Sequence, residues 1–223
     1  MFKEFIIRSK YIIKHTGFMS LIKRIMDYVF TFVFYYEVFC IRLHYIPDIR
    51  MLKEEDFKPA VQDCTIFIVS DNKEADELES QGFKFRSQIF RSREALDKGG
   101  IAFVVFSDKT FASIHWIAFN TEVQMIMGEP PVKVDFTHGE AITVGARTLP
   151  EFRQKGLFSY TMYKTREYLD KKGIEKCWGL TVRKNIASGH VVEKFHPQFI
   201  GYGYWWRILG IEFYWERKQI AGC

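Results

Sequence analysis

Hydrophobic positions near the N-terminus recur at the spacing of an α-helix. Between residues 18 and 29 they fall three or four residues apart, which places them on one helical face; they are Phe18, Leu21, Ile22, Ile25 and Val29. A similar set, with lysines elsewhere on the turn, precedes the Thr16-Gly17 break. The pattern predicts two amphipathic helices that pack on the body of the protein or on a second subunit of a homodimer.

After these helices the chain alternates between strand and helix patterns. β-Branched and aromatic residues dominate residues 28–45, which favours a strand, although the preceding helix could also continue into this stretch. Beyond Pro47, short strands and a hairpin are followed by strand, helix, strand and helix, an order that argues for a mixed α/β sheet. We expect strands at 66–70, 101–106, 111–119, 140–148, 176–182, 201–206 and 211–215, and helices at 72–81, 92–98, 156–172 and 185–195. We therefore divide the chain into an N-terminal amphipathic extension, residues 1–46, and an α/β domain, residues 47–223.

Length and composition fit one domain with an appendage. The 223 residues are 48% hydrophobic and 26% charged, which is ordinary for a globular protein and sufficient for a core. The net charge of +5 is concentrated at the N-terminus, because residues 1–24 contain six Lys or Arg and one Glu. The remaining residues carry 26 charges of each sign. A body without basic bias argues against a nucleic-acid partner, whereas the basic extension leaves peripheral membrane contact through residues 1–30 as an alternative to packing.

Cysteine spacing and hydropathy indicate the cellular compartment of the protein. The four cysteines are far apart and form no C-x-x-C pair, so neither a disulfide framework nor a structural metal site is expected. No secretory signal is evident, and the most apolar run, residues 28–36, is far shorter than the roughly 20 residues that span a bilayer. These observations predict a cytoplasmic protein.

The stretch that carries chemistry runs from Glu140 to Ser159. A β pattern ends at Pro150, a short basic turn follows, and the turn leads directly into a helix. A helix start exposes unpaired backbone N–H groups at the positive end of the helix dipole, an arrangement that binds phosphate. Gly156 lets the backbone approach an anion closely, while Arg153 and Lys155 add positive charge. Alone this is a weak signal, since ordinary surface turns look similar.

The order of motifs around this turn resembles the GNAT superfamily of acyl-CoA-dependent N-acyltransferases. Arg153-x-x-Gly156 is similar to its R/Q-x-x-G-x-G/A signature, and Asn185-Ile-Ala-Ser188 with Glu193-Lys194 looks like its N-x-A-S…Y-E-K segment. The resemblance implies a mixed, largely antiparallel central sheet flanked by helices, whose two middle strands splay apart to admit the pantetheine arm.

The resemblance also implies a set of residues that bind acetyl-CoA or another acyl-CoA as co-substrate, without a metal. The backbone of Ala146, Arg147 and Thr148 would pair with pantetheine, and Asn185 would lie beside it or the thiol. The turn would hold the pyrophosphate through Arg153, Gln154, Lys155, Gly156, Leu157, Phe158 and Ser159. Arg147 stands in an apolar strand, so it should face an anion or be exposed.

The sequence departs from the signature at two positions. Phe158 replaces the expected small residue, which is compatible with the loop only if the ring points into the core, as its helical phase indicates. Val192 stands where the superfamily often has a tyrosine that protonates the leaving thiolate; Tyr202 and Tyr204 are alternative acids.

Direct transfer needs an amine free of its proton, and a lysine-like amine has a reference pKa near 10.4. Glu140 is our candidate for the base that removes this proton, with His115 and His138 as alternatives. Trp116, Trp205, Trp206 and Trp215 could line the acceptor pocket or belong to the core.

The expected activity is N-acetyltransfer, or transfer of another acyl group, to a primary amine on a small molecule or peptide. Two alternatives stay open: a catalytically silent acyl-CoA-binding module, and a transferase that takes an acyl or aminoacyl group from a different donor.

Overall fold

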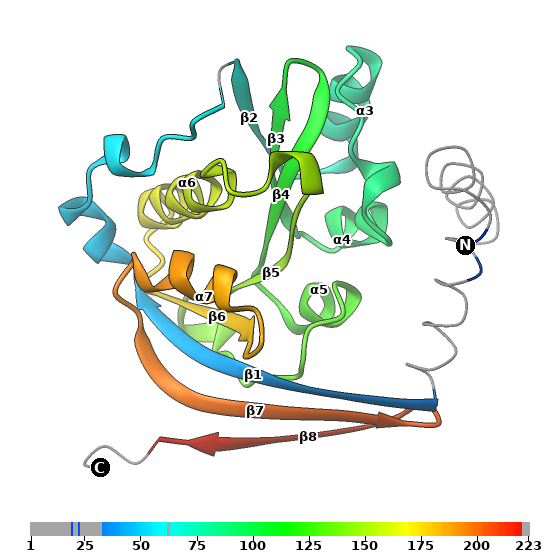
Figure 1. Cartoon of the computed structure of the whole chain (residues 1–223), viewed down its shortest axis with the longest axis vertical. Helices are drawn as coiled ribbons and strands as arrows, with labels where there is room; N and C mark the ends of the chain where they lie inside the picture. The colour runs from blue at the N-terminus through cyan, green and yellow to red at the C-terminus, as the bar shows by residue number, and fades with distance from the viewer. Residues whose placement is uncertain (1–18, 20–21, 23–32, 62, 220–223) are drawn as a thin grey trace.

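A computed structural model describes Met19, Ile22, residues 33–61 and residues 63–219 (Figure 1). Apart from Met19 and Ile22, the two amphipathic helices predicted near the N-terminus lie outside the described residues. No helix within the described residues is both long and apolar enough to cross a membrane.

The described chain is built on one sheet of eight strands in the order β2-β3-β4-β5-β6-β1-β7-β8. Every neighbouring pair is antiparallel except β5 and β6, which run parallel. The strands are β1 (Phe34–Tyr45), β2 (Cys64–Val69), β3 (Ile101–Ser107), β4 (Thr110–Ala118), β5 (Glu140–Thr148), β6 (Lys176–Val182), β7 (Gln198–Ile208) and β8 (Ile211–Lys218). This mixed, largely antiparallel sheet confirms the predicted fold class.

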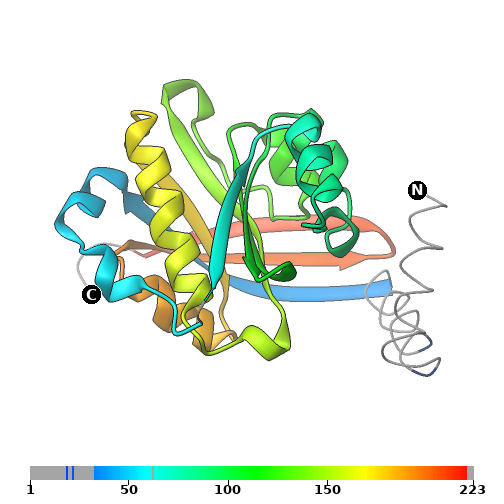
Figure 2. The same ribbon diagram turned by 90° about the horizontal axis from the view of Figure 1, so that it is seen from above.

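Helices cover both faces of the sheet, as Figures 1 and 2 show. One face carries α6 (Leu157–Lys171) and α7 (Ile186–Glu193), and the other carries α3 (Asn72–Ser80), α4 (Ser92–Asp97) and α5 (Thr121–Ile126). Short 3₁₀ turns complete the described chain at Ile46–Met51, Glu54–Phe57, Arg86–Gln88, Phe136–His138 and Pro150–Phe152.

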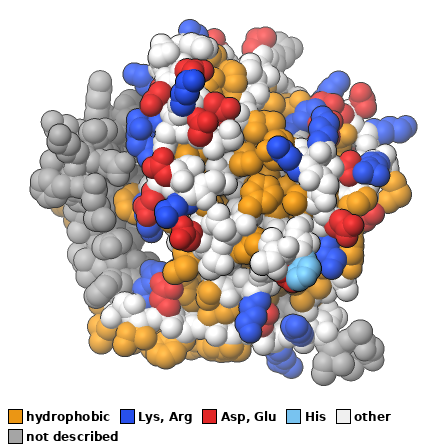
Figure 3. All heavy atoms as spheres, turned by 180° about the vertical axis from the view of Figure 1, so that it is seen from behind, with side chains coloured by type: hydrophobic (Ala, Val, Ile, Leu, Met, Phe, Trp, Pro, Cys, Tyr) orange, Lys and Arg blue, Asp and Glu red, His pale blue; other side chains and the backbone are white. Residues whose placement is uncertain are grey.

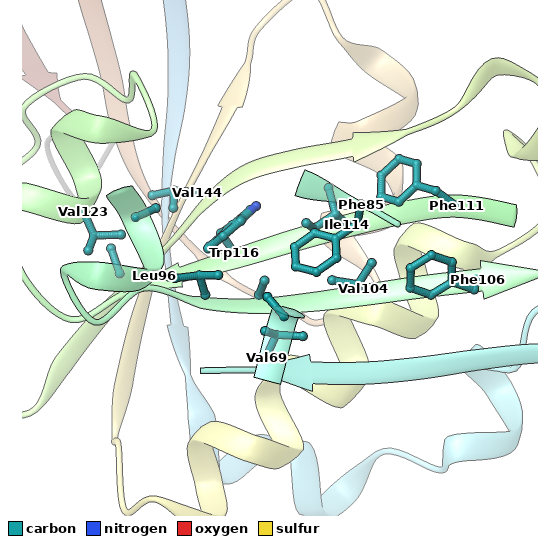
Figure 4. Close-up of a cluster of buried hydrophobic side chains, with 14 of the residues drawn as sticks. Val69, Phe85, Leu96, Val104, Phe106, Phe111, Ile114, Trp116, Val123 and Val144 are labelled. Carbon is teal, nitrogen blue, oxygen red and sulfur yellow. The ribbon is translucent and has the colours of Figure 1, made fainter. Parts of the chain in front are cut away.

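The hydrophobic core has a layer on each face of the sheet. On the α3–α5 side, Trp116, Phe106 and Ile114 are fully buried in one cluster. In Figure 4, Leu96 of α4 and Val123 of α5 lie near Trp116, and Phe111 lies near Phe106. On the α6 side, Leu169 packs with Phe103 and neighbouring strand residues. Burial on both faces explains why the central strands β3 and β4 are almost continuously apolar.

Strand β1 corrects the predicted domain boundary. The sequence assigned residues 1–46 to an extension, but Phe34–Tyr45 lies inside the sheet between β6 and β7. It pairs with β6 from Phe39 to Tyr45 and with β7 from Phe34 to Leu43. The β-forming composition of this stretch therefore reflects a central strand, and the domain includes residues from at least Phe34 onward.

Candidate functional site

The two parallel strands at the middle of the sheet separate along their length. β5 and β6 pair only from Glu140–Lys176 to Thr143–Gly179. Beyond that point β5 continues to Thr148 against β4, and β6 continues to Val182 against β1. Beyond Thr143 and Gly179, therefore, the facing edges of β5 and β6 no longer pair with each other. Strand separation at this place was predicted, and the register confirms it.

A bulge in β5 lies where the strands part. Val144 pairs with Trp116 and Arg147 with Ile114, so Gly145 and Ala146 both lie opposite the single residue between those partners. Gly145 has a φ of +57°, and a Cβ atom there would lie 2.3 Å from the terminal methyl of Met127. The bulge turns the strand edge outward, and Ala146 is exposed.

The turn before α6 presents a row of free backbone donors. Arg153 N–H bonds to the Pro150 carbonyl at 3.2 Å, and Tyr160 N–H bonds to that of Gly156 at 2.9 Å. Between them, the amides of residues 154–159 donate to no acceptor within the part of the chain that the structure describes. Six consecutive N–H groups without an internal acceptor, next to a helix start, suit the binding of an anion.

Gly156 is needed at this turn for two reasons. Its φ of +80° is a conformation that L-residues rarely adopt, and a Cβ atom would lie 3.3 Å from the Cα of Pro59. The amide of Ala60 donates a hydrogen bond to the Lys155 carbonyl at 3.0 Å, so the segment around Pro59 packs against the turn and holds it in place. The sequence pattern singled out this glycine for close approach of the backbone to an anion, and that role stays a prediction.

The side chains of the turn divide between solvent and core. Arg153 and Lys155 are exposed, with Arg153 Nε donating to the Thr148 carbonyl at 3.3 Å and Lys155 lying over the Phe152 ring. Phe158 points inward and packs edge-on against His115, which confirms that it does not crowd the loop. The Ser159 hydroxyl is buried and has no partner among the described residues.

Asn185 lies on the other side of the gap. It caps α7, its side chain accepting from the Ser188 amide at 3.2 Å, and it is exposed. Because β5 and β6 run parallel, Thr148 and Asn185 follow the last strand pair in the same direction, one on each side of the gap. Val192 is buried against Met162 and Phe195, so no acid acts from that position.

The predicted base, Glu140, lies in the paired part of β5. Its carboxylate accepts from Trp178 Nε1 at 2.7 Å and from the Asp135 amide at 3.1 Å, and Lys176 Nζ is 3.7 Å away. It lies opposite Lys176 at the start of the strand, whereas the gap opens after Thr143. The structure therefore does not bring Glu140 to the bulge.

A different carboxylate stands at the bulge. Glu129, in the loop after α5, accepts a hydrogen bond from the Gly145 amide at 3.1 Å. Burial raises the pKa of Glu129 to about 7, against an opposing effect of that hydrogen bond. The side chain is still partly exposed. Burial and the charge of Glu37 raise the pKa of Tyr35, and the charge of Glu129 makes a smaller contribution in the same direction. The Tyr35 phenol therefore lies near Glu129.

Sequence reasoning missed Glu129 because nothing in Gly128-Glu129-Pro130-Pro131 signals chemistry. Its role depends on how α5 and the following loop pack over β5, a relationship between segments. The available hint was a carboxylate held between a glycine and two prolines just upstream of the recognised strand.

Most of the other side chains singled out in the sequence make contacts that stabilise the fold. Burial lowers the pKa of His115 to about 3, and its Nδ1 lies 3.3 Å from the Thr165 hydroxyl. His138 is exposed and paired with Asp135 at 2.7 Å. Arg147 is partly buried and donates to the Gln88 carbonyl at 2.5 Å. Trp116 and Trp205 are core residues.

The alternative acids lie elsewhere. Tyr202 and Tyr204 pair with Cys40 and Val38 and belong to the outer part of the sheet, on the α7 side. Within the described residues, no group of three or more His, Cys, Asp or Glu could hold a metal ion.

The gap and the turn fit the chemistry of an acyl-CoA. A strand edge from which the neighbouring strand has parted can hydrogen-bond the peptide-like pantetheine arm, and backbone amides beside two cations can hold a diphosphate.

Comparison with known proteins gives likeness in structure only. No protein-family model and no curated protein sequence matches the chain. A solved tandem GNAT protein from the clavulanic acid biosynthesis pathway matches with a TM-score of 0.50 at 11% identity, over 78% of this chain and 54% of that one. A GCN5-related N-acetyltransferase-like protein from Streptococcus suis matches with a TM-score of 0.49 at 11% identity, over 86% and 68%.

A putative GNAT-family acetyltransferase from Novosphingobium aromaticivorans matches with a TM-score of 0.45 at 14% identity, over 76% of this chain and 63% of its own length. The chain thus spans 54% of the tandem protein, the one of these three that reaches a TM-score of 0.50. Together with the strand order and the parting of β5 from β6, that likeness shows that the chain has the fold of the GNAT superfamily.

Proposed function

We propose that the chain transfers an acyl group from acyl-CoA to a primary amine. The observation that carries the proposal is the combination of two features on one edge: the edge of β5 beyond Thr143, where pairing with β6 ends, and the amides of residues 154–159, which donate to no acceptor within the described residues. One feature suits a peptide-like arm and the other suits a diphosphate, and the chain places them consecutively.

Glu129 is the base in this proposal. A carboxylate with a pKa of about 7 is divided between its two forms at neutral pH, so it can take a proton from the attacking ammonium group directly or through one water. The freed amine nitrogen forms a C–N bond with the thioester carbonyl carbon, the C–S bond breaks, and the sulfur leaves as the CoA thiolate. The nitrogen loses its second proton and the thiolate takes up a proton, both by exchange with water, which gives the amide and the free CoA thiol. The Gly145 amide fixes the carboxylate beside the bulge.

Binding is tested by thermal shift with acetyl-CoA, longer acyl-CoAs and free CoA. A ligand at about 100 times its Kd adds about 2.7 kcal/mol of stability to the folded state. Gly156→Asp places bulk and negative charge among the free amides, so the ligand-induced shift should disappear. No shift of the wild type with any CoA species would contradict the proposal.

A matched control separates the anion site from backbone strain. Gly173, just after the end of α6, has a φ of +72°, and Gly156 has a φ of +80°. A Cβ atom at Gly173 would meet nothing within 4 Å. Gly173→Asp therefore imposes a similar strain far from the turn, and its ligand-induced shift should equal that of the wild type. Equal loss in both variants would show that folding, and not the anion site, was affected.

The silent-module alternative is favoured by one observation, the buried Val192 in place of an acid. Release of free thiol from acyl-CoA in the presence of an amine panel decides between the two. If CoA binds but no amine is acylated, the chain is a binding module. A panel of non-CoA donors tests the remaining alternative, in which another carrier supplies the acyl or aminoacyl group.

A further inference from the structure

Strands β1, β7 and β8 present a common outer face that is apolar along most of its length. Residues directly opposite in antiparallel strands point to the same side of a sheet. The register therefore groups four cross-strand rows on the α7 side. We call them the outer aromatic face: Phe34, Ile208 and Ile211; Tyr36, Trp206 and Phe213; Val38, Tyr204 and Trp215; Cys40, Tyr202 and Arg217.

Much of this face is open to solvent. The exposed fractions are 53% for Phe34, 51% for Phe213, 48% for Trp215 and 63% for Ile211. Leu209, at the turn between β7 and β8, is 66% exposed. Figure 3 shows hydrophobic side chains along the lower edge of the molecule, the edge that β8 forms in Figure 1. An apolar face of this extent marks an interaction surface.

The rings on this face are held against one another. Trp215 stacks on Tyr204 at 5.3 Å and on Trp206 at 5.9 Å between ring centroids. Tyr36 lies 4.4 Å from Trp206. Tryptophan and tyrosine, with an apolar ring and one polar atom, are the residues enriched where protein meets the membrane–water boundary.

One end of the face is positively charged. An open hollow of about 600 Å³ is lined by Arg183, Arg217 and Lys218, together with Phe199, Tyr202, Tyr204 and Gln219. Its lining includes no carboxylate. The two acids of β8 belong to the opposite side of the sheet, where Glu212 pairs with Arg207 and Glu216 accepts from Tyr214.

We propose that the outer aromatic face docks on an anionic phospholipid bilayer. The lipid phosphate would enter the hollow lined by Arg183, Arg217 and Lys218, and the rings would lie at the level of the headgroups, with the β7–β8 turn among the first acyl carbons. This inference is independent of acyl transfer. It differs from the sequence-based alternative, which placed membrane contact in residues 1–30.

Charge favours a bilayer over the other occupants. A second copy in a two-fold interface would bring the same cations to the face and no carboxylate to meet them. The N-terminal segment is also basic, with six Lys or Arg and one Glu in residues 1–24, so it does not neutralise the hollow either. The basic hollow and the basic N-terminal segment are instead both attracted to an anionic partner. A single-stranded nucleic acid would need free ring faces, and those of Trp215 and Tyr204 are stacked on each other.

Vesicle flotation of the full-length protein tests the proposal. Vesicles of phosphatidylcholine alone are compared with vesicles that contain about 30% phosphatidylglycerol. The wild type should float only with the anionic vesicles. Arg217→Glu should lower the partition coefficient roughly tenfold or more, because each charge near such a surface contributes about 1 kcal/mol and this change reverses one. Phe213→Ser should lower it about tenfold by removing an inserted ring.

Two matched variants serve as controls. Phe90 is 52% exposed, close to the 51% of Phe213, and lies between the Arg86–Gln88 turn and α4 on the other side of the sheet. Phe90→Ser should therefore partition like the wild type. Lys171, whose side chain is 75% exposed at the end of α6, provides the matched charge reversal Lys171→Glu. Thermal melting shows that each variant is folded, and Lys218→Glu replaces Arg217→Glu if that variant does not fold.

Several outcomes would overturn the proposal. One is failure of the wild type to float with anionic vesicles. Another is unchanged flotation of both Phe213→Ser and Arg217→Glu, which would assign binding to other residues. A dimer in light scattering that Phe213→Ser converts to a monomer, without vesicle binding, would make the face a subunit interface. Displacement of vesicles by single-stranded oligonucleotide, but not by mononucleotide, would point to nucleic acid.

Discussion

The Glu129 carboxylate accepts a hydrogen bond from the Gly145 amide, 3.1 Å away, at the bulge where β5 parts from β6. This bond joins a loop carboxylate to the strand edge that would hold an acyl thioester. In the proposed mechanism, this position makes Glu129 the acid–base group of the site.

Replacing Glu129 tests that role directly. Glu129→Gln keeps the side-chain shape and an acceptor for the Gly145 amide but cannot take a proton. We expect kcat to fall by about 10²–10⁴-fold, the usual contribution of a general base, with little change in KM for acyl-CoA. In the wild type, kcat should rise with pH through about 7, as Glu129 ionises, and this limb should be absent in the variant.

Glu140→Gln is the matched control. Because Glu140 is held by Trp178 and Lys176 in the paired part of β5, its replacement should leave kcat within a few-fold of the wild type. A large loss of kcat in this variant, together with an active Glu129→Gln protein, would return the base to the residue that the sequence first indicated.

The same carboxylate should affect stability in the absence of substrate. The pKa of Glu129 is raised from 4.5 to about 7 by burial, so between these values the folded state holds a proton that the unfolded state has lost. The contribution of the protonated group is present below pH 4.5 and is lost as pH rises through about 7. Relative to the wild type, Glu129→Gln should gain free energy of unfolding between pH 4.5 and pH 8 in denaturant titrations. A constant difference across this range would show that the carboxyl is not perturbed.

The positive charge of the turn should govern affinity for the diphosphate. Lys155 is exposed and lies over the Phe152 ring, so reversing its charge leaves the fold intact. Lys155→Glu should raise the Kd for CoA by roughly tenfold or more at low salt, and the difference should shrink as salt screens the charges. Lys84→Glu, an exposed lysine far from the turn, should bind CoA as the wild type does. A salt-independent effect, measured by calorimetry, would indicate altered packing instead.

Local patterns predicted the helix and strands that frame the candidate site. The expected strand bounds at Glu140–Thr148 and Lys176–Val182 agree with β5 and β6, and the expected helix at 156–172 agrees with α6 to within one residue at each end. These elements are defined by signals within a few residues of one another: apolar runs, a proline, and a glycine at each end of the helix. The parting of β5 from β6 followed from the family resemblance, and the register confirmed it.

Contacts between distant segments could not be predicted in this way. The helix Thr121–Ile126 is short and depends on its Asn120 cap and on burial of Val123, so it gave no periodic signal. Glu129 acquires its environment only when the loop after this helix packs over Gly145. The place of β1 in the sheet depends on partners more than 130 residues away, such as Val182 opposite Phe39.

The place of β1 leads to a prediction about truncation. A chain that begins at Pro47 lacks the strand that hydrogen-bonds β6 on one side and β7 on the other. It therefore leaves the facing edges of β6 and β7 without that partner and loses the buried side chains of Ile41 and Leu43. We expect this fragment to show no cooperative thermal transition. A chain that lacks only residues 1–30 keeps β1 and should melt cooperatively. Circular dichroism of both truncations provides the measurement, and a cooperative transition in the fragment from Pro47 would restore the boundary at residue 46.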